Sequence, residues 1–472
     1  MQKEITMDLT SPLKELQVTI TEIIDQLKEH CDVNAACDEI RKALIELAEN
    51  TLKPVIENIV CSSELLPLLK IGAGKLGLRF NGYRQTSVMI FSGKAIKIRS
   101  PYFAKARPKK RKGRKPKKRK RGTGAHFGLD YLGFVDRCTI LLGSSVVQAA
   151  LLCPSYELAR ITLLSQAITL NIKTICRLVM SFGNRAIKHR GRVSLSANDS
   201  AEGKTILICI DGGRLRERKT KRGRKRSGQK RQGFHTKWRE PLQFVIQTIN
   251  EEGVACKEHL PIYDATMGKI DFAFDLLEEY LSNMIISNAD RVVFCGDGAR
   301  SYWKRIGPMM NRLGVNHHHE VIDYTHAKQN LNEIIAMLPK KLSAKEVAKI
   351  TDEWKNLLWE GDVNELEVQI KKQISYPKKR DKALKKFDNY FKKNQDKVRY
   401  ASMQKERLPI GSGCVESAIR RVVNLRMKSP GIFWKKETAE NMLFLRSQLL
   451  SGRWEIMISN IFKELRVLTI CN

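Results

Sequence analysis

The order of strands and helices after Lys204 constrains the fold of this chain more than any other feature of its sequence. KTILICI, LQFVIQTI and VACKEHLPIY have the apolar, β-rich character of strands and are separated by turn signals. The helical pattern DFAFDLLEEYLSNMI follows them. Two strand-helix pairs come next, RVVFC with YWKRIGPMMNRLG, and HEVID with a helix that begins near His326.

This order predicts an α/β domain built on a mixed sheet. Strands joined by short turns pair antiparallel, whereas strands joined through a helix run parallel. Both kinds together give a mixed sheet with helices on its faces, which is the arrangement of the ribonuclease H-like fold. Residues 339–408 are charged and helical in pattern, so we expect a helical insertion there between the two parts of the domain, 201–338 and 409–472.

The region before this domain is expected to be mainly helical. Apolar residues from Leu13 to Leu27 recur at spacings of three and four, and a second amphipathic segment covers 38–50. The two helices either pack on each other or form a coiled coil with a second chain, and the short pattern favours the first. TSVMIF and KAIKIR then predict a β-hairpin, which completes a first region, residues 1–100.

Residues 125–200 are expected to form a helical, DNA-binding region. Ser155 is a candidate helix cap, residues 169–171 can turn the chain, and a second helix begins at Ile172. In a helix-turn-helix this second helix would present three side chains to DNA, namely Lys173, Thr174 and Arg177. An ordinary helical hairpin fits the same pattern.

The formal net charge of +35 points to a polyanionic partner, with nucleic acid ahead of an anionic membrane surface. From Lys105 to Arg121, 13 of 17 residues are basic, and from Arg214 to Arg231 the count is 11 of 18. Runs of this kind are typically disordered and still bind phosphate with a steep salt dependence. We therefore expect a basic disordered linker at 101–124 and a second phosphate-binding run at 214–231.

The compartment is expected to be the cytoplasm, in association with the nucleoid. No apolar run approaches the roughly 20 residues that span a bilayer, and the N-terminal residues lack the apolar core of a secretory signal. The eleven cysteines are scattered and include no CxxC pair, which fits a reducing compartment.

Three acidic residues stand where a mixed sheet would gather a ligand. Asp211 and Asp297 each follow a strand, and the carboxyl ends of neighbouring strands form the usual ligand edge of such a sheet. Glu416 is the single acid in GSGCVESAIRRVVNLRMKSPGIFW, where it either complements a helix N-terminus or reaches across to that edge. Carboxylate oxygens suit magnesium, and without a cation three converging acids would repel one another.

Six motifs, in this order, resemble bacterial insertion-sequence transposases of the DDE class. They are DGGR at Asp211, KWREP at Lys237, YDATMGKID at Tyr263, FCGDGARSYW at Phe294, VIDYTHAKQNL at Val321 and the stretch that contains Glu416. The resemblance covers about residues 125–455. It implies that Asp211, Asp297 and Glu416 hold two Mg²⁺ or Mn²⁺ ions, and that Asp323 and His326 form an Asp-x-x-His element beside the catalytic site.

The resemblance also implies an activity and partners. The enzyme would cleave double-stranded DNA at transposon ends and join it to target DNA, as a homodimer or a larger synaptic assembly. Basic residues near the acids are expected to contact DNA phosphates, namely Arg214, Arg420, Arg421, Arg426 and Lys428. Two other classes stay open: a DNA-binding regulator or transposase relic without chemistry, and a structure-specific ribonuclease H-like nuclease that cleaves but does not join.

Several single residues have competing interpretations. Asp264 also follows a strand and is an alternative first acid. The histidines at 317–319 are expected in a loop, because three adjacent imidazoles cannot all face one ion from a strand. Trp354 and Trp359 are expected to pack in the core of the insertion, with stacking on an unpaired base as the alternative.

Overall fold

The computed structural model describes residues 10–30, 32–105, 124–191, 195–225, 227–229 and 232–470. The chain divides into two compact units. The first unit holds the residues up to Lys188 together with those from Met457 onward, and the second holds His189–Ile456. Within the described ranges, none of the helices has the length and apolar character that crossing a membrane requires.

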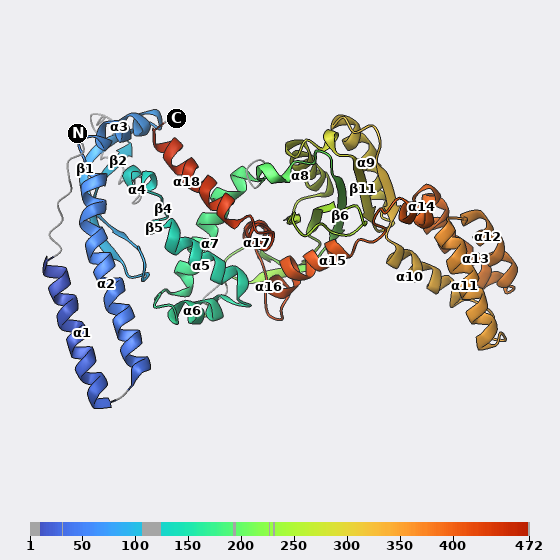
Figure 1. Cartoon of the computed structure of the whole chain (residues 1–472), viewed down its shortest axis with the longest axis horizontal. Helices are drawn as coiled ribbons and strands as arrows, with labels where there is room; N and C mark the ends of the chain where they lie inside the picture. Colours follow the sequence, from blue (N-terminus) through green and yellow to red (C-terminus); the bar gives the residue numbers. More distant parts are fainter. Residues whose placement is uncertain are drawn as a thin grey trace. The chain divides into compact units, whose positions relative to one another are not determined.

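The first unit begins with two long helices and a small sheet (Figure 1). Its elements here are α1 (Thr10–His30), α2 (Val33–Val60), α3 (Leu65–Lys75), β1 (Leu78–Val88), β2 (Ile96–Lys105) and β3 (Gly124–Ala125). The helices α1 and α2 lie side by side, as the sequence favoured, and β1 pairs antiparallel with β2 as the predicted hairpin. The predicted linker begins too early, because residues 101–105 belong to β2; the rest of the basic run lies outside the described residues.

A group of short elements and helices completes the first unit. They are α4 (Phe127–Tyr131), β4 (Phe134–Val135), β5 (Cys138–Thr139), α5 (Ile140–Leu152), α6 (Tyr156–Leu164), α7 (Ile172–Ala186) and most of α18 (Trp454–Ile470). Ser155 caps α6, as predicted, by accepting a hydrogen bond of 3.1 Å from the Leu158 amide. Asn171 caps α7 in the same way, through a bond of 2.9 Å from the Thr174 amide.

The second unit is built on a five-stranded mixed sheet in the order β10-β9-β6-β11-β12. The strands are β6 (Thr205–Gly212), β9 (Leu242–Ile249), β10 (Ile262–Thr266), β11 (Arg291–Gly296) and β12 (His319–Ile322). The pairs β6 with β9 and β9 with β10 are antiparallel, whereas β11 is parallel to both β6 and β12. This mixed topology agrees with the strand order read from the sequence and is compatible with a ribonuclease H-like arrangement.

Two predictions about this sheet are wrong in detail. The third strand is Ile262–Thr266, and VACKEHLPIY is mostly loop that leads into it. The strand was missed because its central residue is Asp264, a charged side chain that is fully buried and therefore needs an ionic partner. The run 214–231 was expected to be disordered, but its residues Leu215–Thr220 form β7, which pairs antiparallel with β8 (Phe234–Arg239) as a ribbon.

Period-two alternation gives the sheet two different faces. On β6, Ile206, Ile208 and Ile210 pack in the core under α8 (Ile270–Asn283) and α9 (Arg300–Arg312). The intervening residues of β6 face the opposite side, where α15 (Gly413–Ile419) contacts β6 and β9, and α17 (Lys436–Leu450) contacts β10. One face is thus an apolar core, and the other lies beneath the helix that carries Glu416.

The insertion is helical, as predicted, and forms a body beside the sheet (Figure 1). After α10 (Tyr324–Ile335) it consists of α11 (Ala344–Glu360), α12 (Val363–Gln373), α13 (Pro377–Tyr390), the short helix Lys392–Lys397 and α14 (Tyr400–Lys405). Trp354 is fully buried, and Trp359 packs against Tyr324 and Tyr400. Core packing, the favoured interpretation of both tryptophans, is confirmed.

Candidate acidic site at the sheet edge

Asp211 and Asp297 lie next to each other because their strands are parallel neighbours in register. Cys209 on β6 is the register partner of Cys295 on β11. Each aspartate lies two residues beyond its cysteine, so it points to the same side of the sheet at the carboxyl edge. Ile210 points to the core face of the sheet, so both aspartates lie on the opposite face. This opposite face is the one on which α15 packs.

Short local hydrogen bonds fix both aspartates at the ends of their strands. The Asp211 carboxylate accepts a bond of 2.6 Å from the Gly212 amide. The Asp297 carboxylate accepts one of 3.0 Å from the Ala299 amide, and the indole of Trp303 donates to the Asp297 carbonyl at 3.0 Å. Both carboxylates are half-buried, so each keeps an open side toward solvent.

Glu416 reaches this edge because Asp323 anchors the start of its helix. The Asp323 carboxylate accepts bonds from the Ser412 amide at 2.5 Å and from the Ser412 hydroxyl at 2.9 Å. Its other oxygen accepts the His326 amide at 2.8 Å and so caps α10. Asp323 and Ser412 are both buried. One carboxylate therefore joins the end of β12, the start of α10 and the segment that leads into α15.

His326 lies between the two carboxylates that flank it. Its Nε2 is 3.9 Å from Oε1 of Glu416, and its Nδ1 is 3.3 Å from Oδ1 of Asp323. The Glu416 side chain is 56% exposed, whereas that of Asp323 is almost fully buried. Neither distance is a hydrogen bond, since the His326 Nδ1 is buried without a hydrogen-bond partner, so the imidazole lies beside both carboxylates as a neighbour.

The pKa of Asp211 depends first on burial and then on the charges around it. Burial raises the pKa of this carboxyl above its ordinary value of 3.8, and the hydrogen bond from Gly212 opposes that shift. The negative charges of Asp297 and Glu416 raise the pKa further, while His326 lowers it. Residues from β6, β11, α15 and α10 therefore meet within electrostatic range at one edge of the sheet.

Replacing Asp211 with asparagine should stabilise the cation-free protein at neutral pH. Because the folded-state pKa of Asp211 is raised, its contribution to stability is complete below its ordinary pKa and is lost as the pH rises through the folded value. The Asp211→Asn protein should therefore unfold at a higher temperature than wild type at pH 7 in a chelator, and the difference should vanish below pH 3.8. Asp381→Asn, on the exposed face of α13, is the control. An Asp211→Asn protein that is less stable than wild type at pH 7 would contradict this expectation.

Removing the Asp323 carboxylate should loosen the helix that carries Glu416. Asp323→Ala loses a helix cap, which costs about 0.5–2 kcal/mol, and its bonds to Ser412, at roughly 1.5–3 kcal/mol for a charged acceptor. We expect a loss of about 2–4 kcal/mol in urea unfolding. Ser412→Ala removes only the hydroxyl bond and should cost about 1–2 kcal/mol. Equal losses in the two proteins would show that the carboxylate is not the anchor.

Three cysteines lie close to the acids in the sequence, and two of them, Cys209 and Cys295, lie one strand repeat before Asp211 and Asp297. Cys209, Cys295 and Cys414 each precede one of the acids by two residues, and the Cys209 and Cys414 sulfurs are 3.5 Å apart. The hydrogen bond with Cys209 and burial raise the pKa of the Cys414 thiol, and contact with Cys295 raises that of Cys209. These thiols are protonated and pack α15 onto the sheet as small apolar groups.

Sequence reasoning missed three side chains at this edge. Tyr302 lies close enough that, after burial, the charges of Asp297 and Asp211 raise its pKa. Tyr390, from the insertion, packs on the turn that follows Asp297. A Cβ added at Gly298 in this turn would lie 2.7 Å from the Tyr390 ring. Glu240 lies against Gly212, where an added Cβ would be 2.5 Å from its carboxylate. The glycines beside the two aspartates were the available signal, because they mark places where other groups approach closely.

The basic residues predicted near Glu416 differ in accessibility. Arg420 and Lys428 are exposed. Arg421 is half-buried and donates a hydrogen bond to the Tyr263 hydroxyl. Arg426 is only 2% exposed and stacks over Trp434, so its predicted contact with DNA phosphates is wrong. The π-helical turn at Arg420–Asn424 rotates this part of the chain relative to a regular α-helix and contributes to the error.

The predicted DNA-facing residues of the first unit lie at the start of α7. Lys173 and Arg177 are exposed and Thr174 is half-buried. The Arg177 guanidinium pairs with the Asp136 carboxylate at 2.7 Å. The helix pair therefore exists as predicted, while its contact with DNA stays a prediction.

Asp264 does not belong to the acidic edge. It is fully buried in β10, and the Arg190 guanidinium binds both of its oxygens, at 2.6 and 2.7 Å. The Tyr280 hydroxyl donates a further bond of 3.0 Å. Because these contacts neutralise its charge in the core, the alternative in which Asp264 replaces Asp211 as first acid is wrong.

The donor set fits a hard divalent cation in its chemistry. Three carboxylates supply the oxygen ligands that magnesium and manganese prefer. Their mutual repulsion, visible at Asp211, is what a bound cation would relieve. Among the residues that the structure describes, no three side chains of His, Cys, Asp or Glu are closed around a common point as a finished metal centre.

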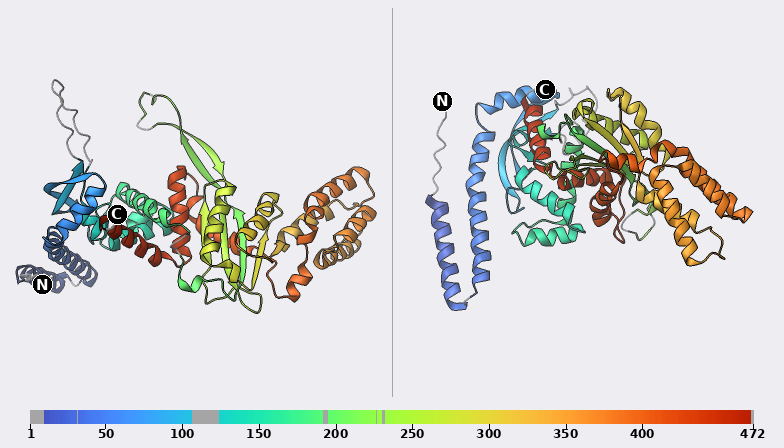
Figure 2. Two further views of the ribbon diagram at one scale, coloured as in Figure 1. Left: turned by 90° about the horizontal axis from the view of Figure 1, so that it is seen from above. Right: turned by 45° about the vertical axis from the view of Figure 1, so that its right-hand side comes forward.

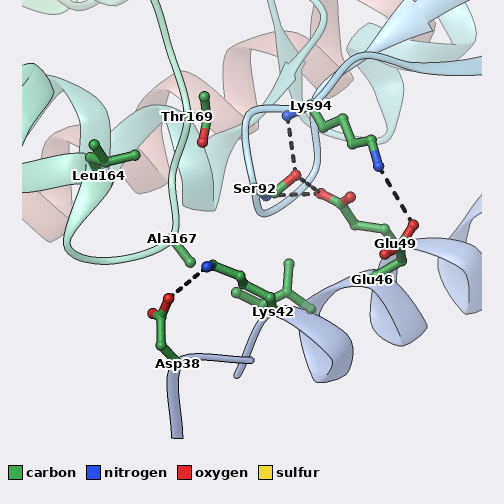
Figure 3. A pocket seen from close by; sticks show the side chains of 10 residues that line it. Asp38, Lys42, Glu46, Glu49, Ser92, Lys94, Leu164, Ala167 and Thr169 are labelled. Carbon is green, nitrogen blue, oxygen red and sulfur yellow. Dashed lines mark hydrogen bonds and ion pairs between the residues drawn. The ribbon is translucent and has the colours of Figure 1, made fainter. Parts of the chain in front are cut away.

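A cavity of about 630 Å³ in the first unit has a different character (Figure 3). The buried Glu49 carboxylate accepts bonds from the Phe91 and Ser92 amides and from the Ser92 hydroxyl, at 2.8–3.1 Å. Its two lysines pair with acids, Lys42 with Asp38 at 2.6 Å and Lys94 with Glu46 at 3.5 Å. The cavity is lined by three acids against these two lysines, so its charge disfavours phosphate.

Comparisons with known proteins add little to this geometry. No protein-family model matches the chain, and no curated protein matches it. Among solved structures, the Drosophila P element transposase strand transfer complex matches with a TM-score of 0.31 and 10% sequence identity, over 68% of this chain and 93% of that chain. A likeness this distant carries no argument about fold or activity, so the function is inferred from the residues of the site.

Proposed function

We propose that this chain is a DNA transposase of the DDE class, which cuts DNA at the ends of a mobile element and joins those ends to target DNA. The observation that supports this most is the register of β6 and β11, which puts Asp211 and Asp297 at one sheet edge, with the Glu416 helix packed on the same face. A net charge of +35 on the same chain suits a polyanionic substrate. The six ordered motifs of the sequence support the same class.

In this proposal Asp211, Asp297 and Glu416 hold two Mg²⁺ or Mn²⁺ ions. Such a pair, when bound, supplies Lewis-acid stabilisation of the attacking and leaving oxygens in an in-line phosphoryl displacement. His326, whose Nε2 is 3.9 Å from Glu416, would position that side chain when the ions are bound. The exposed Arg420 and Lys428 would bind phosphates next to the reacting one.

Two reactions would use this one site. Attack of water on a phosphodiester at the element end would release a 3′-hydroxyl, and attack of that hydroxyl on a target phosphodiester would join the two DNAs. Both steps exchange one P–O bond for another and need no redox partner. Because two ends must be joined to one target, the active form is expected to be a homodimer or a larger assembly on DNA.

The test is a strand-transfer assay with purified protein and the DNA that flanks its gene. Matching inverted repeats in that DNA, end cleavage, and joined products would support a transposase. Cleavage without joining would instead assign a nuclease, and duplex binding without either reaction would assign a regulator without chemistry. The three classes are therefore distinguished in one experiment.

A further inference from the structure

The β7–β8 ribbon stands directly beside the acidic edge. Only Gly213 and Arg214 separate β6, which contains Asp211, from the first residue of β7. The Gly213 amide donates to the Pro241 carbonyl at 2.8 Å and closes the root of the ribbon. From this root the two strands extend away from the sheet (Figure 2, green in the left view). A ligand bound at the root of the ribbon is therefore held near Asp211.

A third segment stiffens the ribbon from the side of the Glu416 helix. The Trp434 amide donates to the Arg216 carbonyl at 2.9 Å, and the Arg218 amide donates to the Trp434 carbonyl at 2.8 Å. The Arg216 guanidinium also binds the Ser429 carbonyl at 2.8 Å. The ribbon is thus fixed to the chain segment that follows the catalytic helix.

One face of the ribbon alternates arginine with aromatic rings. The cross-strand pair Arg216 and Trp238, with Arg214, Arg218 and Phe234, lies on this face. The Arg214 and Arg216 guanidinium carbons lie 5.3 and 5.7 Å from the centre of the Trp238 ring, and that of Arg218 lies 6.0 Å from the centre of Phe234. The other face carries Glu217, the single acid between residues 214 and 239, which is buried and paired with Arg239 at 3.4 Å.

This face has the properties of a DNA-binding surface. Guanidinium groups laid on aromatic rings are held extended, so less side-chain entropy is lost when they bind phosphate or guanine. The rings stay partly exposed, Trp238 at 49% and Phe234 at 40%, so they add apolar surface beside the arginines. A two-stranded ribbon fits the major groove of B-form DNA, which is about 12 Å wide.

We propose that the arginine–aromatic face of the β7–β8 ribbon binds double-stranded DNA with the ribbon in the major groove, beside the phosphate that is cut. This inference rests on the proposed function, because it takes DNA as the substrate. It adds a duplex-binding element that positions the substrate at Asp211. Arg214 and Arg218 are the exposed cations that would contact the duplex, and Trp238 is the ring that orders Arg214.

The experiment measures binding of a labelled DNA duplex in chelator, so that no cleavage occurs, over a range of salt concentrations. Arg214→Gln/Arg218→Gln should bind about tenfold more weakly, and its plot of log affinity against log salt should be shallower by about 1.8, or 0.9 for each lost phosphate contact. Lys378→Gln/Lys382→Gln, on the exposed face of α13, changes the same charge and is the matched control. An unchanged slope in the ribbon variant, or an equal change in the control, would overturn the proposal.

Two further measurements test the aromatic rings and the groove. Trp238→Ala should weaken binding without changing the salt slope, because it removes no charge, and Trp238→Phe should bind as wild type does. A duplex of RNA, whose major groove is too deep and narrow for side chains to read, should show no effect of Arg214→Gln/Arg218→Gln. An equal loss on RNA would mean that the ribbon only tethers phosphate, and the groove assignment would be wrong.

Failure of this inference can be told from failure of the proposed function. If wild-type protein cleaves and joins DNA but the ribbon variants bind as wild type does, only the ribbon assignment fails. If wild-type protein binds duplexes through the ribbon but never cuts them, the transposase assignment fails while the ribbon assignment stands.

Discussion

Replacing Asp297 with asparagine should reduce DNA cleavage by at least about 10³-fold, which corresponds to roughly 4 kcal/mol of lost transition-state stabilisation. The substitution keeps the shape of the side chain and the oxygen that accepts the Ala299 amide, but it removes the negative charge that the proposed cation site needs beside Asp211. Duplex affinity should stay within about twofold, because phosphate contacts made by basic residues set binding. The assay is nicking of a plasmid that carries the gene and its flanking DNA, in Mg²⁺ or Mn²⁺.

The matched control for this experiment is Asp381→Asn, the same change on the exposed face of α13. It should cleave as wild type does. Glu416→Gln should lose activity as Asp297→Asn does, even though its carboxylate is exposed and comes from a different part of the chain. Cleavage within tenfold of wild type in either acid variant would remove these residues from the catalytic site.

Replacing Arg190 with methionine should destabilise the second unit by about 3–5 kcal/mol, because it leaves buried carboxylates without their cation. The Arg190 side chain is 6% exposed and binds Asp264 at 2.6 Å and Glu440 at 2.5 Å. Burial lowers the pKa of Arg190, but the carboxylates of Asp264 and Glu440 raise it by more. The guanidinium therefore stays charged. Through its bonds to Asp264 in β10 and Glu440 in α17, Arg190 connects the start of the second unit to these two elements. Differential scanning calorimetry should show a loss of about 10 °C in Tm.

Burial, and not contact distance, should decide the size of this effect. Arg305→Met breaks an ion pair of 2.5 Å with Asp271 in which both side chains are partly exposed, and it should cost about 0–1 kcal/mol. Adding Asp264→Asn to Arg190→Met should restore part of the lost stability, since asparagine can still accept the Tyr280 hydroxyl without a buried charge. Equal losses for Arg190→Met and Arg305→Met would contradict this explanation.

Hydrophobic patterning determined most of the sheet from the sequence. β9 was predicted to the residue, and β6, β11 and β12 to within one or two, because each is a short apolar run closed by a turn or an acid. Their connections then fixed which pairs are parallel. Hydrophobic patterning failed to predict a strand that has a charged residue in the core. It also failed where exposed basic residues obscure the alternation of buried and exposed positions. Asp264 lies in the middle of β10, and the basic residues of β7 mask the buried Leu215 and Glu217.

The roles of individual charged residues were harder to predict than the elements that carry them. Asp264 and Arg190 are far apart in the sequence and have nothing in their neighbours that marks them as a buried pair. Arg426 looked like its exposed neighbour Lys428, but the π-helical turn and Trp434 place it in the core. Contacts of this kind depend on which surfaces meet after the chain has folded.

The amino-acid sequence by itself determined that acids follow β6 and β11 on the same face of a mixed sheet, since strand periodicity and connection length are local properties. Only the tertiary structure decided that the helix of Glu416 packs on that face. Its approach depends on the buried Asp323 carboxylate that binds Ser412, on the thiols of Cys209 and Cys414 that let α15 lie close to the sheet, and on His326 beside it. These are contacts between segments far apart in the chain, and no local pattern encodes their distance.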